Sequence, residues 1–257
     1  MAEAQRQPDV IDTAPAFVQA DADALNARFA GVDTGAMLTE LLAGELKGRI
    51  AIVSSFGAES AALLHLVAAV DKTVPLIFIN TQKMFGETLA YRDELAERLG
   101  FTDLRVFRPD PYDLAARDQT GLRWSYDPDG CCDIRKVRPL RRALAPFDAW
   151  ISGRKAFQAK SRAALPRFEI DEGRLKLNPL ADWSKEQLEA YIDEHKLPRH
   201  PLVAQGYPSI GCSPCTSKVG PGEDPRSGRW KGWEKTECGI HGEASASELP
   251  PGYDPAF

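Results

Sequence analysis

Short apolar runs alternate along this chain with longer segments in which apolar residues recur every three or four positions. The short runs are rich in Val, Ile, Leu and Phe, which is typical of strands buried on both faces of a sheet. The longer segments have the periodicity of helices with a buried face. The pattern predicts strands at 49–53, 74–79, 103–107 and 149–153, with helices at 59–70 and 88–99.

Further helices are predicted on either side of this region. Residues 22–46 have helical spacing that is interrupted near Gly31–Gly35, which indicates two helices. Residues 183–198 begin with a capping box formed by Ser184 and Gln187. Strands that alternate with helices imply an α/β fold, in which a parallel sheet carries helices on both faces.

The 257 residues are long enough for one large domain, and a segment of different character lies at each end. Residues 1–22 are polar and contain proline, so we expect a flexible N-terminal segment. Residues 23–217 hold all the predicted strands and helices. Residues 218–257 are dominated by Gly, Pro, Ser and charge without a core pattern, which favours a mobile C-terminal tail.

Overall charge limits the partners of the chain. The formal net charge is −5, so general attraction to nucleic acid or to an anionic membrane is not expected, and an anionic ligand would need a local basic pocket. No apolar run approaches the roughly 18 residues that span a bilayer. Residues 1–17 lack the pattern of a signal peptide. We therefore expect a cytoplasmic protein with reduced thiols and with no nucleic-acid or membrane partner.

The five cysteines form two close pairs and one isolated residue. Cys131–Cys132 and Cys212–Cys215 together offer four thiolates, and a Cys-x-x-Cys loop presents two of them to one metal. Adjacent cysteines are unusual in zinc sites, and four thiolates also suit an iron–sulfur cluster, so the spacing does not decide between zinc and iron–sulfur. Without a metal, these residues would act as small buried apolar side chains.

The stretch SSFGAES follows the first predicted strand and precedes a helix. Ser54, Ser55 and Gly57 are small, so backbone N–H groups there can approach an anion closely, and the helix N-terminus adds a favourable dipole. The stretch lies where ligands bind in open α/β sheets, beyond the carboxyl end of a strand. No Gly-Lys-Ser/Thr follows, so this is not a Walker A loop. The alternative is a tight turn without a ligand.

Three basic segments lie beside cysteines or strand ends, at 133–142, 152–162 and 226–233. Each one alone is best interpreted as a solvated face, but together they could form a pocket for a polyanion with phosphate or sulfate groups. The last segment precedes Cys238 and His241. A cationic pocket would lower the pKa of that thiol and make it reactive, with His241 polarising it or binding an oxyanion, whereas a thiol in an exposed tail would be inert.

In combination, the stretches SSFGAES, GCCDIRK, GCSPCT, RSGRW and ECGIH, in this order, resemble the assimilatory adenylyl-sulfate reductases of the adenylyl- and phosphoadenylyl-sulfate reductase family. The resemblance runs from about Ala51 to His241. It implies an adenine-nucleotide α-hydrolase-like fold and the reduction of adenosine 5′-phosphosulfate to sulfite and AMP in assimilatory sulfate reduction. The electron donor would be thioredoxin or a similar dithiol.

The resemblance also implies roles for single residues. Residues 23–217 would bind nucleotide and cluster, and the tail at 218–257 would carry the nucleophile, Cys238, which forms an S-sulfocysteine. The implied ligands of a [4Fe–4S] cluster are Cys131, Cys132, Cys212 and Cys215. The substrate site would comprise three residues of the SSFGAES loop and six later residues. They are Ser54, Ser55, Gly57, Lys136, Arg162, Arg226, Arg229, Trp230 and His241.

Three residues depart from the family pattern. Ala156 and Ala159 stand where a Gly-x-Arg-Arg-x-Gln-Ser run has arginine and serine, and Asn80 stands where aspartate is usual. The substitution at Asn80 makes its loop less anionic.

Other functions remain open on the sequence alone. A reductase of the 3′-phosphorylated substrate is one, although family members that use only that substrate typically lack the four paired cysteines. An ATP-pyrophosphatase-type thiolation enzyme shares the strand–loop–helix start but gives ECGIH no role. A zinc-stabilised nucleic-acid binder is disfavoured by the net acidity. The oligomeric state, a homo-oligomer included, is not determined by the sequence.

Overall fold

A mostly parallel sheet forms the centre of the computed structural model, which describes residues 15–159 and 162–240. The described residues contain one six-stranded sheet with the order β3-β2-β1-β4-β6-β5. Neighbouring strands are parallel except β5 and β6, which form an antiparallel hairpin at one edge. The strands are β1 (Ile50–Val53), β2 (Leu76–Ile79), β3 (Leu104–Phe107), β4 (Ala149–Ile151), β5 (Phe168–Asp171) and β6 (Arg174–Leu177).

The four strands predicted from the sequence are confirmed, and their ends agree to within two residues. The β5–β6 hairpin was not predicted, because its residues alternate between charged and apolar types and form no apolar run. Its turn places Glu172 at φ 48° and Gly173 at φ 75°. Two consecutive residues with positive φ are what a tight two-residue hairpin requires.

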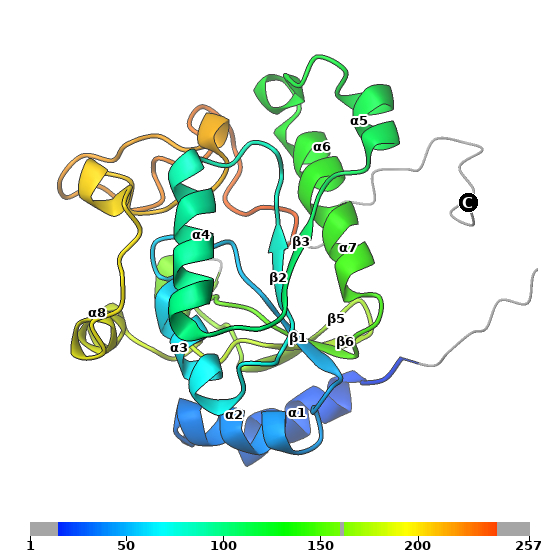
Figure 1. Cartoon of the computed structure of the whole chain (residues 1–257), viewed down its shortest axis with the longest axis vertical. Coiled ribbons are helices and arrows are strands. Elements are labelled where there is room, and N and C mark those ends of the chain that lie inside the picture. Colours follow the sequence, from blue (N-terminus) through cyan, green and yellow to red (C-terminus); the bar gives the residue numbers. More distant parts are fainter. Residues whose placement is uncertain (1–14, 160–161, 241–257) are drawn as a thin grey trace, which may run out of the picture.

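Helices cover both faces of the sheet, as predicted (Figure 1). Successive residues of a strand point to opposite faces, so Ile50 and Ile52 pack in one core and Ala51 in the other. The second core also contains Trp150 and is covered by α7 (Arg138–Leu144). The helices that contribute to the first core are α1 (Gln19–Arg28), α2 (Thr34–Ala43), α3 (Ser60–Val70), α4 (Gly86–Leu99) and α8 (Lys185–Glu194).

A helical insertion that the periodicity did not predict lies between β3 and β4. It begins with α5 (Pro111–Arg117) and continues with α6 (Pro128–Cys132). A π-helical turn at Asp133–Val137 then joins α6 to α7 without a break. The periodicity failed here because α5 and α6 are short and α5 has no buried residue. π-Helical turns of this kind occur often at functional sites.

The strand order places the loops of β1 and β4 next to each other. In the sheet, β2 and β3 lie on one side of β1, and β4 and β6, which follow later in the sequence, lie on its other side. The carboxyl ends of β1 and β4 therefore flank the point where the direction of winding reverses. Ligands of open α/β sheets bind in the crevice at such a point.

The two terminal segments lie partly within the described residues. Helix α1 begins at Gln19, inside the segment predicted to be flexible, and residues 1–14 lie outside the described part. Residues 218–240 contain no helix or strand, yet Trp230 is only 4% exposed. This part of the tail therefore packs against the domain, while 241–257 lie outside the described residues. Within the described part, no helix is both long and apolar enough to cross a membrane.

His200 gives the fold a defined sensitivity to acid. Its Nδ1 accepts a hydrogen bond from the backbone N–H of Leu202 at 3.2 Å, and its Nε2 lies 3.0 Å from the Thr88 hydroxyl. Burial lowers the pKa of His200 from 6.5 to about 4, although nearby Glu87 opposes this shift. Because the unfolded chain then binds the proton more readily, stability should fall as pH drops from about 6.5 to about 4.

We expect this loss to be on the order of 2 kcal/mol, and His200→Gln should remove it because glutamine does not titrate. The measurement is denaturant unfolding of both proteins at several pH values. The slopes of stability against pH, rather than the absolute stabilities, are compared. Equal slopes for the two proteins between pH 6.5 and 4 would contradict the assignment.

Candidate active site

The SSFGAES loop is held in shape by a buried aromatic residue. The backbone N–H of Ser54 continues the sheet ladder to Ile77 at 3.0 Å, and its hydroxyl accepts a hydrogen bond from the N–H of Phe56 at 3.1 Å. Phe56 has φ 49°, is fully buried and packs edge-on against Phe78. This anchored turn leaves Ser55 exposed at the end of β1. A strained backbone conformation at such a position is typical of functional loops.

The first cysteine pair lies at the end of α6, where the helix widens into the π turn. Asp127 caps α6 by accepting a hydrogen bond from the N–H of Gly130 at 2.8 Å. Cys131 and Cys132 follow, and each is only 7% exposed. Arg135, one turn later, forms a buried ion pair with Asp118 and donates to the Thr81 carbonyl at 2.9 Å. This arginine ties the helix to the loop after β2.

The second cysteine pair is attached to the same loop. The backbone of Cys212 forms an isolated antiparallel β-bridge with Met84, and the N–H of Ser213 donates to the Lys83 carbonyl at 2.7 Å. The Cys212 thiol lies 3.2 Å from the Thr81 hydroxyl. As a result, all four paired cysteines line one small cavity together with Lys136 and Trp230. The structure thus brings together two pairs that lie about eighty residues apart in the sequence.

The chemistry of this donor set fits a metal-containing group. Burial and the neighbouring thiols raise the pKa of Cys131 to about 12 and that of Cys215 to about 11, and burial also raises the pKa of Cys132. Four thiolates can therefore coexist here only beside strong positive charge. Within the described residues, no three Cys, His, Asp or Glu side chains are placed to hold a single metal ion. Four thiols on one cavity are a donor set that an iron–sulfur cluster takes.

The RSGRW segment is held by backbone contacts with the Cys212–Cys215 loop. The N–H of Trp230 donates to the Cys215 carbonyl at 3.1 Å, and the backbone of Thr216 forms an isolated antiparallel β-bridge with Arg229. The Arg229 guanidinium lies 4.4 Å from the Trp230 ring centre and rests on Gly211, where any Cβ would collide with it. The Nε of Arg229 is buried and has no hydrogen-bond partner among the described residues. A buried donor without a partner indicates a missing acceptor.

Two further predicted arginines meet the residue that precedes Cys238. Arg162 donates from Nε and from one terminal nitrogen to the two carboxylate oxygens of Glu237, both at 2.6 Å. Arg226 donates to the Thr236 carbonyl at 2.6 Å and also lies 3.3 Å from Glu237. These contacts keep Cys238, which is half-buried, inside the site.

Charged groups surround the Cys238 thiol. Burial disfavours the charged form of Lys136, yet its pKa is raised by the thiols of Cys212, Cys132 and Cys238. Burial lowers the pKa of Lys176 to about 8, although Asp171 and the Cys238 thiolate oppose the shift.

Arg154 is a third basic residue near the thiol. Burial, together with repulsion from Arg162, lowers its pKa to about 10, and Glu237 and Cys238 are among the groups that oppose this shift. Lys176 and Arg154 were not predicted as site residues. Lys176 sits in the alternating strand β6, and the sequence indicates Arg154 only as one member of a basic segment.

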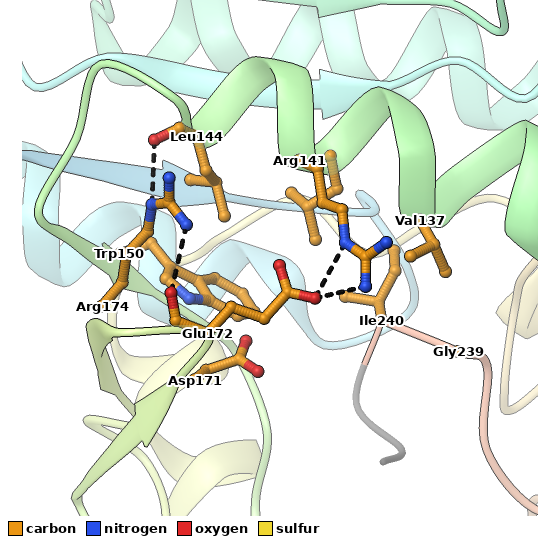
Figure 2. A pocket seen from close by; sticks show the side chains of 10 residues that line it. Val137, Arg141, Leu144, Trp150, Asp171, Glu172, Arg174, Gly239 and Ile240 are labelled. Atoms are coloured by element: carbon orange, nitrogen blue, oxygen red, sulfur yellow. Dashed lines mark hydrogen bonds and ion pairs between the residues drawn. The ribbon is translucent and has the colours of Figure 1, made fainter. Parts of the chain in front are cut away.

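A second cavity lies just beyond Cys238 (Figure 2). Its volume is about 120 Å³, and its lining includes Trp150 of β4, Leu144 of α7 and Ile240 of the tail. Ile240 packs on the smaller core. Gly239 lies so close to Val137 that an added Cβ would be 3.0 Å from its methyl group. Together these contacts anchor the chain immediately after Cys238.

Comparison with known proteins agrees with this arrangement. The sequence matches the family described as "Phosphoadenosine phosphosulfate reductase domain" over residues 49–218. It is 55% identical over 192 residues to a protein of Mesorhizobium japonicum named adenosine 5′-phosphosulfate reductase, and the match covers 75% of this chain and 76% of that relative. The chain belongs to the phosphoadenosine phosphosulfate reductase domain family.

Solved structures share the fold of this reductase domain. The structure of phosphoadenylyl-sulfate reductase from Candida auris in a phosphate complex has a TM-score of 0.68 and 26% identity, covering 80% of this chain and 100% of that one. The Candida glabrata FMN adenylyltransferase with FAD and inorganic pyrophosphate has a TM-score of 0.51 and 16% identity, covering 76% of this chain and 65% of that one. The latter likeness concerns the fold alone. The predicted adenine-nucleotide α-hydrolase-like fold is confirmed.

Most of the residues predicted from the sequence have defined places in this reductase domain. Arg162 and Arg226 meet at Glu237, while Lys136 lies near the thiols of Cys132 and Cys238. His241 lies outside the described residues. The loop residues Ser54, Ser55 and Gly57 lie at the end of β1, and within the described residues no hydrogen bond or ion pair joins them to the tail.

The three departures from the family pattern have local roles in the backbone. Asn80 accepts a hydrogen bond from the N–H of Gln82 at 2.9 Å, so it shapes its turn. Ala156 begins a 3₁₀ turn that ends at Gln158, and Ala159 follows it.

Arg229 is expected to bind an anion rather than to hold the fold. Arg229→Ala should weaken the binding of a sulfate-bearing nucleotide at least tenfold, because a charge-assisted hydrogen bond contributes about 1.5–3 kcal/mol. Unfolding stability should fall by only about 1 kcal/mol, the value of its contact with Trp230. Calorimetric titration and thermal unfolding measure the two effects.

Lys231→Ala is the matched control, since Lys231 is an exposed cation in the same segment. Its loss should change neither quantity. A large loss of stability in Arg229→Ala with unchanged binding would contradict the assignment.

Proposed function

We propose that this protein reduces adenosine 5′-phosphosulfate to sulfite and AMP, with Cys238 as the nucleophile. The observation that carries this proposal is the docking of the tail. The contacts of Glu237 with Arg162 and Arg226 hold the adjacent thiol in a basic pocket beside the paired cysteines. The name of the Mesorhizobium japonicum relative supports the choice of substrate.

The pocket suits a substrate with two anionic groups on one end and a nucleoside on the other. The unpartnered Nε of Arg229 and the ammonium of Lys136 offer charge-assisted donors for phosphate and sulfate oxygens. The SSFGAES loop lies at the β1–β4 switch point, where adenine nucleotides bind in related folds. The adenosine therefore lies against the sheet, and the sulfate points toward the tail.

The reaction proceeds in two displacement steps on sulfur. The Cys238 thiolate attacks the sulfate sulfur and the S–O bond to AMP breaks, so AMP leaves with the bonding pair and the enzyme carries an S-sulfocysteine. One thiolate of a dithiol such as thioredoxin then attacks the Cys238 sulfur, and sulfite leaves with the bonding pair. The second thiol of the donor closes its disulfide and frees the Cys238 thiol. The dithiol supplies both electrons.

The basic residues promote the first step. Lys136, Arg154 and Lys176 place positive charge beside the Cys238 thiol, where it attracts the anionic end of the substrate. The same charges stabilise the oxygens of the sulfate as AMP leaves. The tail must later separate from the pocket, because a protein donor has to reach a sulfur that is half-buried when the tail is docked.

Cys131, Cys132, Cys212 and Cys215 are the residues that would hold a [4Fe–4S] cluster, since they line one cavity. When bound, the cluster's iron core would compensate the charge of the four thiolates, and the cluster would order the loops around the substrate. Two contacts connect these loops. The Thr81 hydroxyl contacts the Cys212 thiol, and Arg135 donates a hydrogen bond to the Thr81 carbonyl. We place this activity in the cytoplasm, as part of sulfate assimilation, where reduced thiols persist.

Anaerobically purified protein should be brown and should contain about four irons and about four acid-labile sulfides per chain. Cys131→Ser and Cys212→Ser should each lose the iron and the activity, because a serine hydroxyl is a poor substitute for thiolate. Iron, sulfide and visible absorbance are measured together, before and after exposure to air. A colourless, iron-free protein with full activity would refute the cluster.

Cys238→Ser should keep the iron and bind the nucleotide but produce almost no sulfite, because a hydroxyl is barely ionised at neutral pH. The wild-type protein, given substrate without reductant, should gain the mass of one SO₃ group on the peptide that contains Cys238. Added thioredoxin should remove that mass and release an equal amount of sulfite. An adduct on one of the paired cysteines instead, or normal turnover by the serine variant, would overturn the assignment.

A further inference from the structure

The carboxylate of Glu237 occupies hydrogen-bond donors that an incoming anion would need. It is bound by two of the arginines predicted to bind substrate, Arg162 and Arg226. The side chains of Glu237 and Arg162 are 15% and 8% exposed, so this ion pair is largely withdrawn from water. A carboxylate and a sulfate or phosphate group present similar oxygen acceptors to a guanidinium.

Each nitrogen of the Arg162 guanidinium donates a hydrogen bond in this structure. Its Nε and one terminal nitrogen form the two-pronged contact with Glu237, and its other terminal nitrogen donates to the Gln158 side chain at 2.6 Å. The two-pronged face formed by Nε and the first terminal nitrogen is thus taken by Glu237. Arg162 therefore cannot bind a substrate anion through this face unless Glu237 leaves.

Arg162 also connects the tail to the SSFGAES loop. Gln158 donates to the carboxylate of Glu59, the last but one residue of that loop, at 2.7 Å. Lys155 pairs with the same carboxylate at 3.0 Å. A chain of contacts thus runs from the predicted nucleotide loop through Gln158 and Arg162 to the neighbour of the nucleophile.

We propose that Glu237 is an internal anion, which occupies Arg162 and Arg226 when the site is empty and which the anionic end of the substrate displaces. The identity of that substrate rests on the function proposed above, but the competition itself does not. Because Glu237 and Cys238 are adjacent, the exchange repositions the thiol only when an anion is bound. Gly239 and Ile240 keep the following residues anchored during the exchange.

The exchange also favours product release. When AMP and later sulfite leave, the carboxylate returns to the arginines, so the pocket never holds several unpaired buried cations. Glu237 is in this sense a positioning residue, and it makes no contact with the reacting atoms.

Glu237→Gln tests the proposal, because glutamine keeps the size of the side chain and removes its charge. The first measurement is calorimetric titration of the holoenzyme with inorganic sulfate in chloride buffer of constant ionic strength. The variant should bind sulfate roughly tenfold more tightly, since sulfate no longer competes with a charged group. The second measurement is the rate at which iodoacetamide labels Cys238 without sulfate, followed on its peptide, and the variant should react several-fold faster.

Three further variants separate the charge of Glu237 from its position and from the anchoring of the tail. Glu234→Gln removes the same charge from an exposed residue of the same segment and should match the wild type in both measurements. Ile240→Ala should speed labelling by loosening the anchor but leave sulfate affinity unchanged. Glu237→Asp keeps the charge and should keep sulfate affinity near that of the wild type.

Sulfate affinity in Glu237→Gln that is equal to or weaker than that of the wild type would overturn the proposal, as would an equal gain in Glu234→Gln. Neither measurement requires turnover. A protein that makes no sulfite from adenosine 5′-phosphosulfate would therefore count against the proposed function alone. In a protein that does turn over, Glu237→Gln should lower both KM and kcat, because the substrate binds more easily while the thiol is less well positioned.

Discussion

Positive charge confined in a partly buried pocket is the constraint on which this structure depends. Lys136, Arg154, Arg162, Lys176 and Arg226 are all withdrawn from water to some degree, and burial lowers the pKa of Arg154 to about 10 and that of Lys176 to about 8. Such charges must be matched by anions, because an unpaired buried cation is costly. The protein supplies Glu169 and Asp171 from the hairpin, Glu59 from the first loop and Glu237 from the tail.

The sheet explains how these charges meet. Parallel strands end at the same edge, so the segments after β1, β4 and β6 converge although they lie far apart in the sequence. Ser152 and Asn178, which follow β4 and β6, are joined by a hydrogen bond of 2.7 Å. The tail then closes the same edge by backbone contacts with the Cys212–Cys215 loop and by the packing of Ile240 on the smaller core. The thiol is positioned by a segment that has no helix or strand of its own.

The features that the sequence pattern did not predict were missed for two different reasons. The β5–β6 hairpin, which contains Lys176, alternates charged with apolar residues. This pattern resembles an exposed segment as much as an edge strand. Their burial arises because the antiparallel edge packs beneath α1 and beside Trp150, and Lys176 lies 4.7 Å from the Trp150 ring centre. Helices α5 and α6 were missed because segments of seven and five residues show too few periods to be recognised.

The sequence by itself determined the four central strands, the helices of the first core, the capping box of α8 and the order of motifs that points to this family. These depend on local periodicity or on residue identity, which the chain carries directly. Only the tertiary structure decided that Glu237, rather than the nearby Glu234, meets Arg162 across 75 positions. Charge pairing depends on distance and on exclusion of water, and both arise only when the sheet and the tail are packed together.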